Sequence, residues 1–124
     1  MDQLNFISGV VVSAGIRTHQ KLGPGLLESV YEVVLARDLV RLGLCVERQK
    51  RVTFEFEGTV FEDAFRPDLI VNNALVVEVK AARAFEPVFA RQLLTYLKIL
   101  NLPLGLVMNF GMVTMKEGIR RVAN

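Results

Sequence analysis

The segment from Phe65 to Ala81, FRPDLIVNNALVVEVKA, restricts the fold more than any other part of the chain. It predicts two short strands joined by an Asn-Asn turn, because apolar runs flank the two asparagines. A strand that only filled a core would be apolar throughout, yet Asp68 lies on the first strand, and Glu78 and Lys80 lie on the second. Ionised groups are rarely buried without a partner, so we expect the chemistry of the protein here.

The register of this hairpin decides whether the two acids meet, because one residue of slip moves every side chain to the other face. A two-residue turn would send Asp68 and Glu78 to opposite faces. We expect a three-residue turn, Val71–Asn73, or an equivalent bulge, which pairs Asp68 with Val76 and puts Glu78 diagonally beside Asp68. The same register collects four apolar side chains on the other face: Leu69, Leu75, Val77 and Val79.

Two carboxylates and a lysine on one face suit the binding of a hard divalent cation. Carboxylate oxygens are the ligands that Mg²⁺ prefers, and the adjacent ammonium can contact a water molecule or an anionic substrate. Asp68 and Glu78 are therefore candidate metal ligands for Mg²⁺ or Mn²⁺, and Lys80 is a candidate catalytic residue. The alternative is a surface acid-lysine pair on a solvent-facing sheet, which is common in proteins.

The rest of the chain shows helical and strand periodicities in turn. Apolar residues spaced near 3.6 predict three helices, at residues 2–21, 26–42 and 87–100. Alternation and compact apolar runs predict strands at residues 53–57, 60–70, 74–81 and 104–110, with a shorter strand before the first and an edge strand at 119–122. This order predicts a small α/β domain in which helices cover a mixed β-sheet.

Glycine and proline mark the ends of the predicted helices. The segment 22–25, LGPG, should end the first helix, Gly43 fits the C′ position of the second, and Pro87 fits the first turn of the third. The second helix is expected to bury six residues: Leu27, Val30, Tyr31, Val34, Leu35 and Leu39. The third is expected to bury five: Val88, Leu93, Leu94, Leu97 and Leu100.

Composition restricts the class of protein. The 124 residues are 52% hydrophobic and contain no repeat or linker-like tract, so we expect one domain over residues 1–124. No apolar run approaches the ~20 residues needed to cross a bilayer, and a basic leader is absent, so we expect a cytoplasmic protein without membrane contact. The single cysteine, Cys45, should be a small buried residue; a thiol nucleophile is the alternative.

Several polar residues on the predicted helices are candidates for the same site, each with a structural alternative. Glu28 would occupy the third helical position if Gly25 is the N-cap, where the helix dipole favours a carboxylate. Tyr31 lies one turn later and fits a core position equally well. Gln92 and Tyr96 are four residues apart and share a helix face, which an amide-hydroxyl pair would also explain.

Several classes of site are excluded, and the charge is only mildly basic. His19 is the only histidine, so a His-rich zinc site cannot form, and we favour a structural hydrogen bond over catalysis for it. GxSxG and phosphate-binding glycine motifs are absent. The net charge of +2 is compatible with nucleic acid where basic residues cluster. The candidates for backbone contacts are Arg17, Lys21, Arg48, Lys50, Arg51, Arg66, Arg83, Arg91, Arg120 and Arg121.

The order of these residues resembles the PD-(D/E)xK nuclease superfamily: Glu28, then Pro67-Asp68, then the segment 78–80, EVK, then Gln92. More narrowly, the segment 25–31, GLLESVY, is similar to the motif that names the GxxExxY protein family, a small branch of that superfamily. The similarity covers nearly the whole chain. It extends to four further segments: 22–24, 92–97, 109–110 and 118–121.

The resemblance implies a restriction-endonuclease-like αβββαβ core, here with an extra N-terminal helix. It also implies metal-dependent hydrolysis of nucleic acid, commonly DNA and often by a dimer. Asp68 and Glu78 would ligate the metal together with the backbone carbonyl of Val79, and Glu28 would bind a second ion directly or through water. All four motif positions are intact, so an active enzyme is expected.

The resemblance also assigns roles beyond the metal ligands. Lys80 would orient or deprotonate the attacking water and stabilise charge on the phosphate, and Gln92 would steady the site. Tyr31, Tyr96 and His19 are candidate accessory residues. The leading hypothesis is thus a Mg²⁺-dependent nuclease; the alternatives are a non-catalytic nucleic-acid- or protein-binding module on the same fold, and an enzyme acting on another phosphate ester. A symmetric homodimer would suit the cutting of two strands.

Overall fold

The protein is built around a five-stranded mixed β-sheet. The computed structural model describes residues 2–124. The strands lie in the order β1 (Val46–Arg48), β4 (Leu69–Val71), β5 (Leu75–Lys80), β6 (Leu104–Asn109) and β7 (Ile119–Ala123). β5 and β6 are parallel, whereas the other neighbours are antiparallel. A parallel pair needs a crossover connection, and helix α3 (Pro87–Leu100) provides it.

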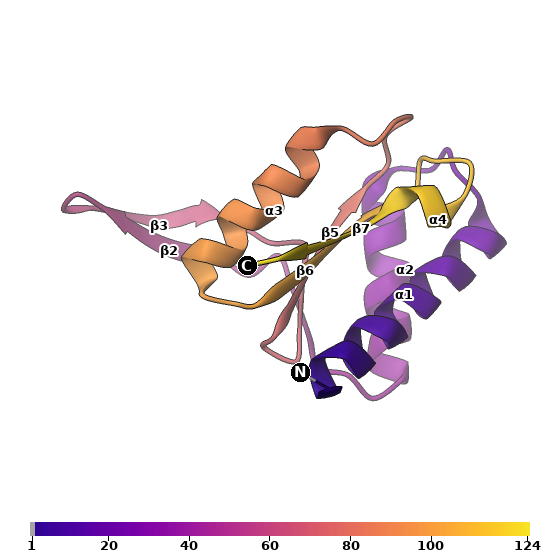
Figure 1. Ribbon diagram of the computed structural model, residues 1–124, viewed down its shortest axis with the longest axis horizontal. Helices are drawn as coiled ribbons and strands as arrows, with labels where there is room; N and C mark the ends of the chain where they lie inside the picture. The colour runs from indigo at the N-terminus through magenta and orange to yellow at the C-terminus, as the bar shows by residue number, and fades with distance from the viewer. Residues whose placement is uncertain (1) are drawn as a thin grey trace.

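Helices cover both faces of the sheet (Figure 1). α1 (Asp2–Leu22) and α2 (Glu28–Arg41) pack on one face, and α3 packs on the other. Strand β5 serves both layers, because Val77 and Val79 join the core under α1 and α2, whereas Val76 joins the core under α3. The predicted class, a mixed β-sheet flanked by helices with an extra N-terminal helix, is confirmed.

The predicted strand at residues 60–70 is wrong, because two strands of different sheets occupy it. β3 (Thr59–Phe65) pairs only with β2 (Val52–Phe56), as a two-stranded hairpin that projects from the body of the molecule (Figure 1). β4 begins only at Leu69 and enters the main sheet. Pro67 explains the break, since it has no N–H for a strand ladder and restricts the residue before it.

The turn between β4 and β5 has three residues, but it comprises residues 72–74 and not Val71–Asn73 as expected. Asn72 and Asn73 both adopt the left-handed conformation, with φ of 50° and 53°, which asparagine tolerates. Val71 pairs with Leu75, so continuing the register puts Asp68 directly opposite Glu78 rather than diagonal to it. Because the turn still has an odd number of residues, Asp68 and Glu78 share one face of the sheet and the apolar side chains of β4 and β5 face the other side, as predicted.

Most predicted helix ends are confirmed. α1 ends at Leu22, Gly43 follows the C-cap of α2 with φ of 91°, and Pro87 opens α3. α2 begins at Glu28 with Leu27 as its N-cap, so the expectation that Gly25 caps this helix is wrong. A short helix, α4 (Met115–Gly118), was not predicted. Within residues 2–124, no helix is long and apolar enough to span a membrane.

Four residues predicted to be buried are exposed. Leu27 precedes α2 and is 75% exposed, and Val30 lies on the outer side of its first turn. Val88 is 62% exposed on α3, because Phe85 and Phe89 occupy the apolar positions at this end of the helix. Cys45 is also exposed, in the connection between α2 and β1, so its prediction as a buried apolar residue is wrong.

Candidate functional site

The centre of the candidate site is the pair Asp68 and Glu78, at the point where the β4–β5 ladder ends. The backbone N–H of Asp68 donates to Glu78 Oε2 at 2.8 Å, and the N–H of Val79 donates to Asp68 Oδ2 at 2.8 Å. Each acid therefore replaces a carbonyl acceptor that a continued strand ladder would supply. These bonds hold the two carboxylates close together, with Glu78 only 4% exposed and Asp68 half-buried.

The electrostatics of this pair are unfavourable. Burial raises the pKa of Glu78 to about 8, and the charge of Asp68 is the next contributor. Burial also raises the pKa of Asp68 to about 6, with the charge of Glu32 adding to the effect and the Val79 N–H opposing it. Neutralisation by a shared proton or by a cation would relieve the repulsion between two such carboxylates.

Lys80 is held beside the acids by a chain of hydrogen bonds from α3. Its Nζ donates to Gln92 Oε1 at 2.9 Å, and Gln92 Nε2 donates to the Tyr96 hydroxyl at 2.9 Å. The ammonium also lies 5.1 Å from the centre of the Phe89 ring. The structure thus brings together Lys80, Gln92 and Tyr96, and the charge of Lys80 acts to lower the pKa of Glu78.

The segment GLLESVY forms the approach to α2. Tyr31 is fully buried, and its hydroxyl donates to the Gly23 carbonyl at 2.6 Å and accepts from the Leu26 N–H at 3.0 Å. Gly25 has φ of 112°, which residues with a Cβ rarely adopt. The glycine and the tyrosine of this segment therefore fix the loop that delivers Glu28 to the start of α2.

Glu28 lies at the rim of the site. It is exposed, and after burial and Asp68 its charge is a further cause that raises the pKa of Glu78. Within residues 2–124, no group of three or more His, Cys, Asp or Glu side chains is arranged to hold a metal ion. The fold does bring together two carboxylates whose charge Lys80 balances only in part, and these oxygen donors fit a hard divalent cation.

Sequence reasoning missed a second group of polar residues behind Asp68. Gln49 Nε2 donates to Asp68 Oδ1 at 3.0 Å and to Glu32 Oε1 at 2.8 Å, and the Gln49 N–H donates to the Asp68 carbonyl at 3.1 Å. Glu32 is 5% exposed and pairs with Arg48 at 2.9 Å. Gln49 has φ of 51°, a conformation that non-glycine residues seldom adopt.

One of these residues did leave a signal in the sequence. Glu32 is spaced i+3 and i+7 before Leu35 and Leu39, so it lies on the buried stripe of α2, where a carboxylate needs a partner. Gln49 left none, since its contacts depend on the pairing of β1 with β4. An acid on an apolar stripe is the pattern that could have found this network.

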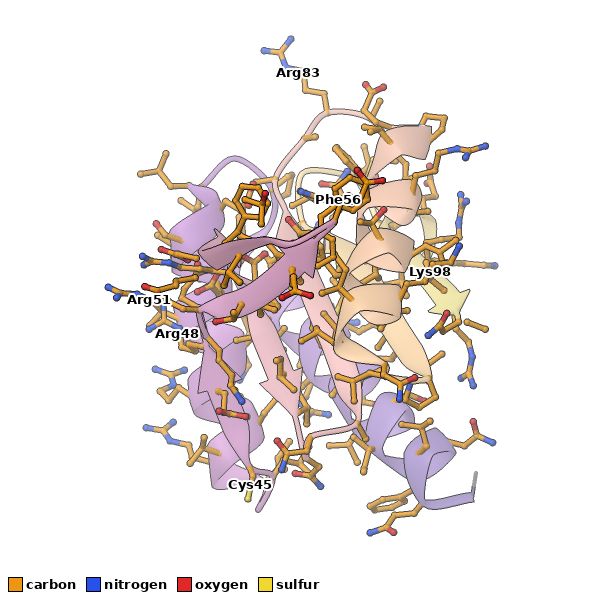
Figure 2. All side chains as sticks on the ribbon, turned by 90° about the vertical axis from the view of Figure 1, so that its left-hand side faces the viewer. Cys45, Arg48, Arg51, Phe56, Arg83 and Lys98 are labelled. Atoms are coloured by element: carbon orange, nitrogen blue, oxygen red, sulfur yellow. The ribbon has the colours of Figure 1, made fainter. Side chains whose placement is uncertain are left out.

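The remaining candidates lie outside this cluster. His19 Nε2 makes a hydrogen bond of 2.9 Å with the Met112 carbonyl, on the α1 side of the sheet. Among the proposed nucleic-acid contacts, Arg66 pairs with Asp63 and Lys50 with Glu47. Arg83 projects from the loop between β5 and α3, and Arg51 from the base of the hairpin (Figure 2). Arg91 lines a groove of about 550 Å³ between α3 and β7.

Comparisons with known proteins agree with this arrangement at the level of the superfamily. No curated protein matches the chain, and no solved structure does. A family model described as the PD-(D/E)XK nuclease superfamily matches residues 5–122. The matched range contains both acids, Lys80 and Gln92. Since it spans nearly the whole sequence, the chain belongs to the PD-(D/E)XK nuclease superfamily.

Proposed function

We propose that this protein is a metal-dependent nuclease that hydrolyses phosphodiester bonds of nucleic acid, with DNA as the expected substrate. The observation that carries the proposal is the pair of a half-buried Asp68 and a buried Glu78 beside a Lys80 held by Gln92. Superfamily membership supports the reaction class. The proposal extends to one nuclease-like domain over residues 1–124, to the GxxExxY branch and to a cytoplasmic location, all of which stay predictions.

Asp68 and Glu78 would hold Mg²⁺ or Mn²⁺, with the Val79 carbonyl as a further ligand and Glu28 serving a second ion directly or through water. Burial raises the pKa of both acids, and the nearby charges of Glu32 and Asp68 add to the shifts of Asp68 and Glu78, so a divalent cation would be favourable here. When bound, such an ion lowers the pKa of a water molecule and neutralises the oxygens of the phosphate. The donor set supports a hard cation over zinc, since it holds only oxygen.

Lys80 is the residue that we assign to the reaction itself. Gln92 Oε1 accepts a hydrogen bond from the Lys80 ammonium, which fixes the position of that group. From this position the Lys80 ammonium would orient the attacking water or bind a phosphate oxygen as the P–O bond to the leaving group breaks, and only as the neutral amine could Lys80 receive the proton of the water. Gln92 and Tyr96 would act through Lys80 and not on the substrate.

The test is cleavage of single-stranded, duplex and branched DNA and of RNA in the presence of Mg²⁺ or Mn²⁺. We expect the wild type to cut at least one substrate and Asp68→Asn, Glu78→Gln and Lys80→Ala each to lose about 10²-fold or more of that activity. Asp63→Asn and Lys98→Ala are the controls, because they change an exposed aspartate and an exposed lysine outside the site. The proteins that carry them should cut the substrate as fast as the wild type. If the wild type cuts none of these substrates, or if the site variants cut as fast as the wild type, the proposal is wrong.

Other outcomes separate the alternatives. Metal-independent binding of an oligonucleotide or protein without cleavage would indicate a non-catalytic module on the same fold. Hydrolysis of nucleotides without strand cleavage would indicate an enzyme for another phosphate ester. A homodimer, which would let one assembly cut both strands of a duplex, is a separate part of the proposal.

A further inference from the structure

Two aromatic rings connect Lys80 of the candidate site with an arginine on the edge of the sheet. The Lys80 ammonium lies 5.1 Å from the centre of the Phe89 ring, and Phe89 packs edge-to-face on Phe85 with ring centres 5.6 Å apart. Phe85 in turn carries the guanidinium of Arg120, whose Cζ lies 4.6 Å from the ring centre. Arg120 belongs to β7, which is an edge strand. The rings therefore hold one cation at the site and a second cation beyond it.

The register of the sheet places Arg120 on the same face as Glu78. Val107 of β6 pairs with Glu78 on one side and with Arg120 on the other. Side chains at paired positions share a face of a sheet, and Val107 packs in the core under α3. Glu78 and Arg120 thus lie on the α3 face, two strands apart.

The stacked guanidinium of Arg120 can still bind an anion. Its side chain is exposed, and among residues 2–124 no acid forms a salt bridge with it. Stacking uses the flat face of a guanidinium and leaves the N–H groups at its edge, which bind phosphate oxygens through two parallel hydrogen bonds. Phe85 therefore presents Arg120 in an orientation that suits a phosphate.

The groove between α3 and β7 around Arg120 is positively charged. It has a volume of about 550 Å³. Within the part of the chain that the structure describes, its lining includes three arginines, Arg91, Arg120 and Arg121, and no acid. Arg121 donates to Asn5 Oδ1 at 2.9 Å, so Arg91 and Arg120 are the cations that face a ligand of the groove. A groove of this charge favours an extended anion.

We infer that Arg120 binds a phosphate of the nucleic-acid strand one or two nucleotides away from the bond that is cut. The inference rests on the proposed function and adds a substrate-binding residue outside the cluster of acids. Two rings separate Lys80 from Arg120, so the two cations cannot share one phosphate, whereas a nucleic-acid strand carries a negative charge at every nucleotide. Phe85 is the positioning residue for Arg120.

This contact restricts the class of substrate. An oligonucleotide that extends past the cleaved bond toward β7 reaches both Lys80 and Arg120, whereas a mononucleotide reaches only one of them. The protein therefore acts on strands and discriminates against mononucleotides. Its binding to strands weakens as salt increases, because each phosphate contact releases counterions.

Oligonucleotide binding tests Arg120 independently of cleavage. Fluorescence anisotropy of fluorescein-labelled DNA and RNA oligonucleotides without divalent metal gives the dissociation constant at several salt concentrations. We expect Arg120→Gln to raise the dissociation constant about tenfold and to reduce the slope of its salt dependence by about one. Phe85→Leu should weaken binding in the same direction, and Phe85→Tyr, which keeps an aromatic ring, should bind like the wild type.

Arg41→Gln is the matched control. Arg41 is an exposed arginine in the last turn of α2, and α2 covers the face of the sheet opposite to α3 (Figure 1). This variant should bind with the affinity and the salt dependence of the wild type. Circular dichroism of each variant verifies that it is folded.

Oligonucleotides with a single neutral linkage locate the contact along the strand. A methylphosphonate removes the charge of one phosphate, so a series with one such linkage each shows which phosphates the protein uses. With the wild type and Mg²⁺, cleavage should slow about tenfold when the neutral linkage lies one or two positions from the cut bond on one side. The same linkage should have little further effect on Arg120→Gln, whereas Arg41→Gln should keep the wild-type pattern.

The outcomes separate this inference from the proposed nuclease activity. If the wild type cuts but Arg120→Gln binds as tightly, or keeps the full methylphosphonate effect, the inference is wrong and the nuclease proposal stands. If the wild type binds through Arg120 but cuts nothing, the nuclease proposal is wrong and Arg120 is still a phosphate-binding residue. A wild type that binds neither DNA nor RNA, or an equal loss of binding with Arg41→Gln, would overturn the inference.

Discussion

At the scale of single residues, Gln49 shows how a neutral side chain controls a charged one. Its amide bridges Glu32 and Asp68, and its backbone N–H holds the Asp68 carbonyl. Two acids that approach one another would repel, and an amide donor between them reduces that repulsion. Outer partners of this kind orient metal ligands in many proteins. The left-handed backbone of Gln49 is the strain that this placement requires.

We therefore expect Gln49→Ala to weaken Mg²⁺ or Mn²⁺ binding by about tenfold or more, because Asp68 loses the donor that fixes Oδ1. Titration calorimetry with each metal measures the effect. Gln49→Gly removes the amide and also relieves the backbone strain, so it should remain well folded while losing the same affinity.

Lys50→Ala is the control for this residue, since Lys50 is the exposed neighbour and pairs only with Glu47 in the part of the chain that the structure describes. It should bind metal like the wild type. If both Gln49 variants bind Mg²⁺ or Mn²⁺ as tightly as the wild type, the hydrogen bond from Gln49 to Asp68 does not contribute to metal binding.

At the scale of elements, the loop before α2 depends on one hydroxyl group. The Tyr31 hydroxyl closes the turn between Gly23 and Leu26 from within the core, while its ring stacks on Phe110 at 4.7 Å. The same loop sets the start of α2 and hence the place of Glu28. A tyrosine that sequence periodicity assigns to the core can thus also organise the rim of the site.

Tyr31→Phe keeps the ring and removes both hydrogen bonds. We expect the free energy of unfolding to fall by about 1–3 kcal/mol, because the Leu26 N–H and the Gly23 carbonyl lose their partner. Urea denaturation measures the change. Tyr96→Phe removes a more exposed hydroxyl and should lower the free energy of unfolding by less than Tyr31→Phe does. An equal or larger decrease with Tyr96→Phe would contradict this account.

The elements also show how far sequence reasoning reached. Helical periodicity located the three long helices, because each packs an apolar face on the sheet, and the compact apolar run at residues 104–110 located β6. The edge strand expected at residues 119–122 corresponds to β7. The sequence pattern failed at residues 60–70, where the single strand that was expected is divided between two sheets and only Pro67 marked the break. For the site, the order of Asp68, Glu78, Lys80 and Gln92 was readable, whereas the Gln49 bridge was not, since it arises from long-range strand pairing.

At the scale of the whole molecule, the paired acids make stability depend on pH. The pKa of Asp68 is raised from 3.8 to about 6 and that of Glu78 from 4.5 to about 8, mainly by burial. The folded protein therefore binds more protons than the unfolded chain between these values. The stability that the protonated Asp68 and Glu78 contribute is fully present below the pKa values of the unfolded chain. It is lost as pH rises through the pKa values of the folded protein.

Without divalent metal, we expect the melting temperature to fall as pH rises from about 4 to about 8. The corresponding loss in the free energy of unfolding should be a few kcal/mol at most, that is, about 1.4 kcal/mol for each unit of pKa difference before the exposure of Asp68 is taken into account. Mg²⁺ or Mn²⁺ should reverse the loss at the alkaline end, because a cation that binds only the folded state stabilises it. Thermal scans across this range measure both effects.

The variant Asp68→Asn/Glu78→Gln is the matched control, since it keeps the size of both side chains and removes their charge. Its melting temperature should be less dependent on pH than that of the wild type, higher near pH 8 and insensitive to metal. A wild type that becomes more stable as pH rises through this window would contradict the buried, repelling pair.

The three-residue turn between β4 and β5 has a consequence for how this protein can evolve. Substitutions at residues 72–74 preserve the register, and the turn can lose or gain a residue without changing it as long as Val71 stays opposite Leu75. If Val71 instead slid by one residue along β5, the core and site faces of β4 would be exchanged, and Asp68 would face the α1–α2 layer. Relatives that keep the paired acids should therefore vary in the length and chemistry of this turn more than in the pairing of Val71 with Leu75.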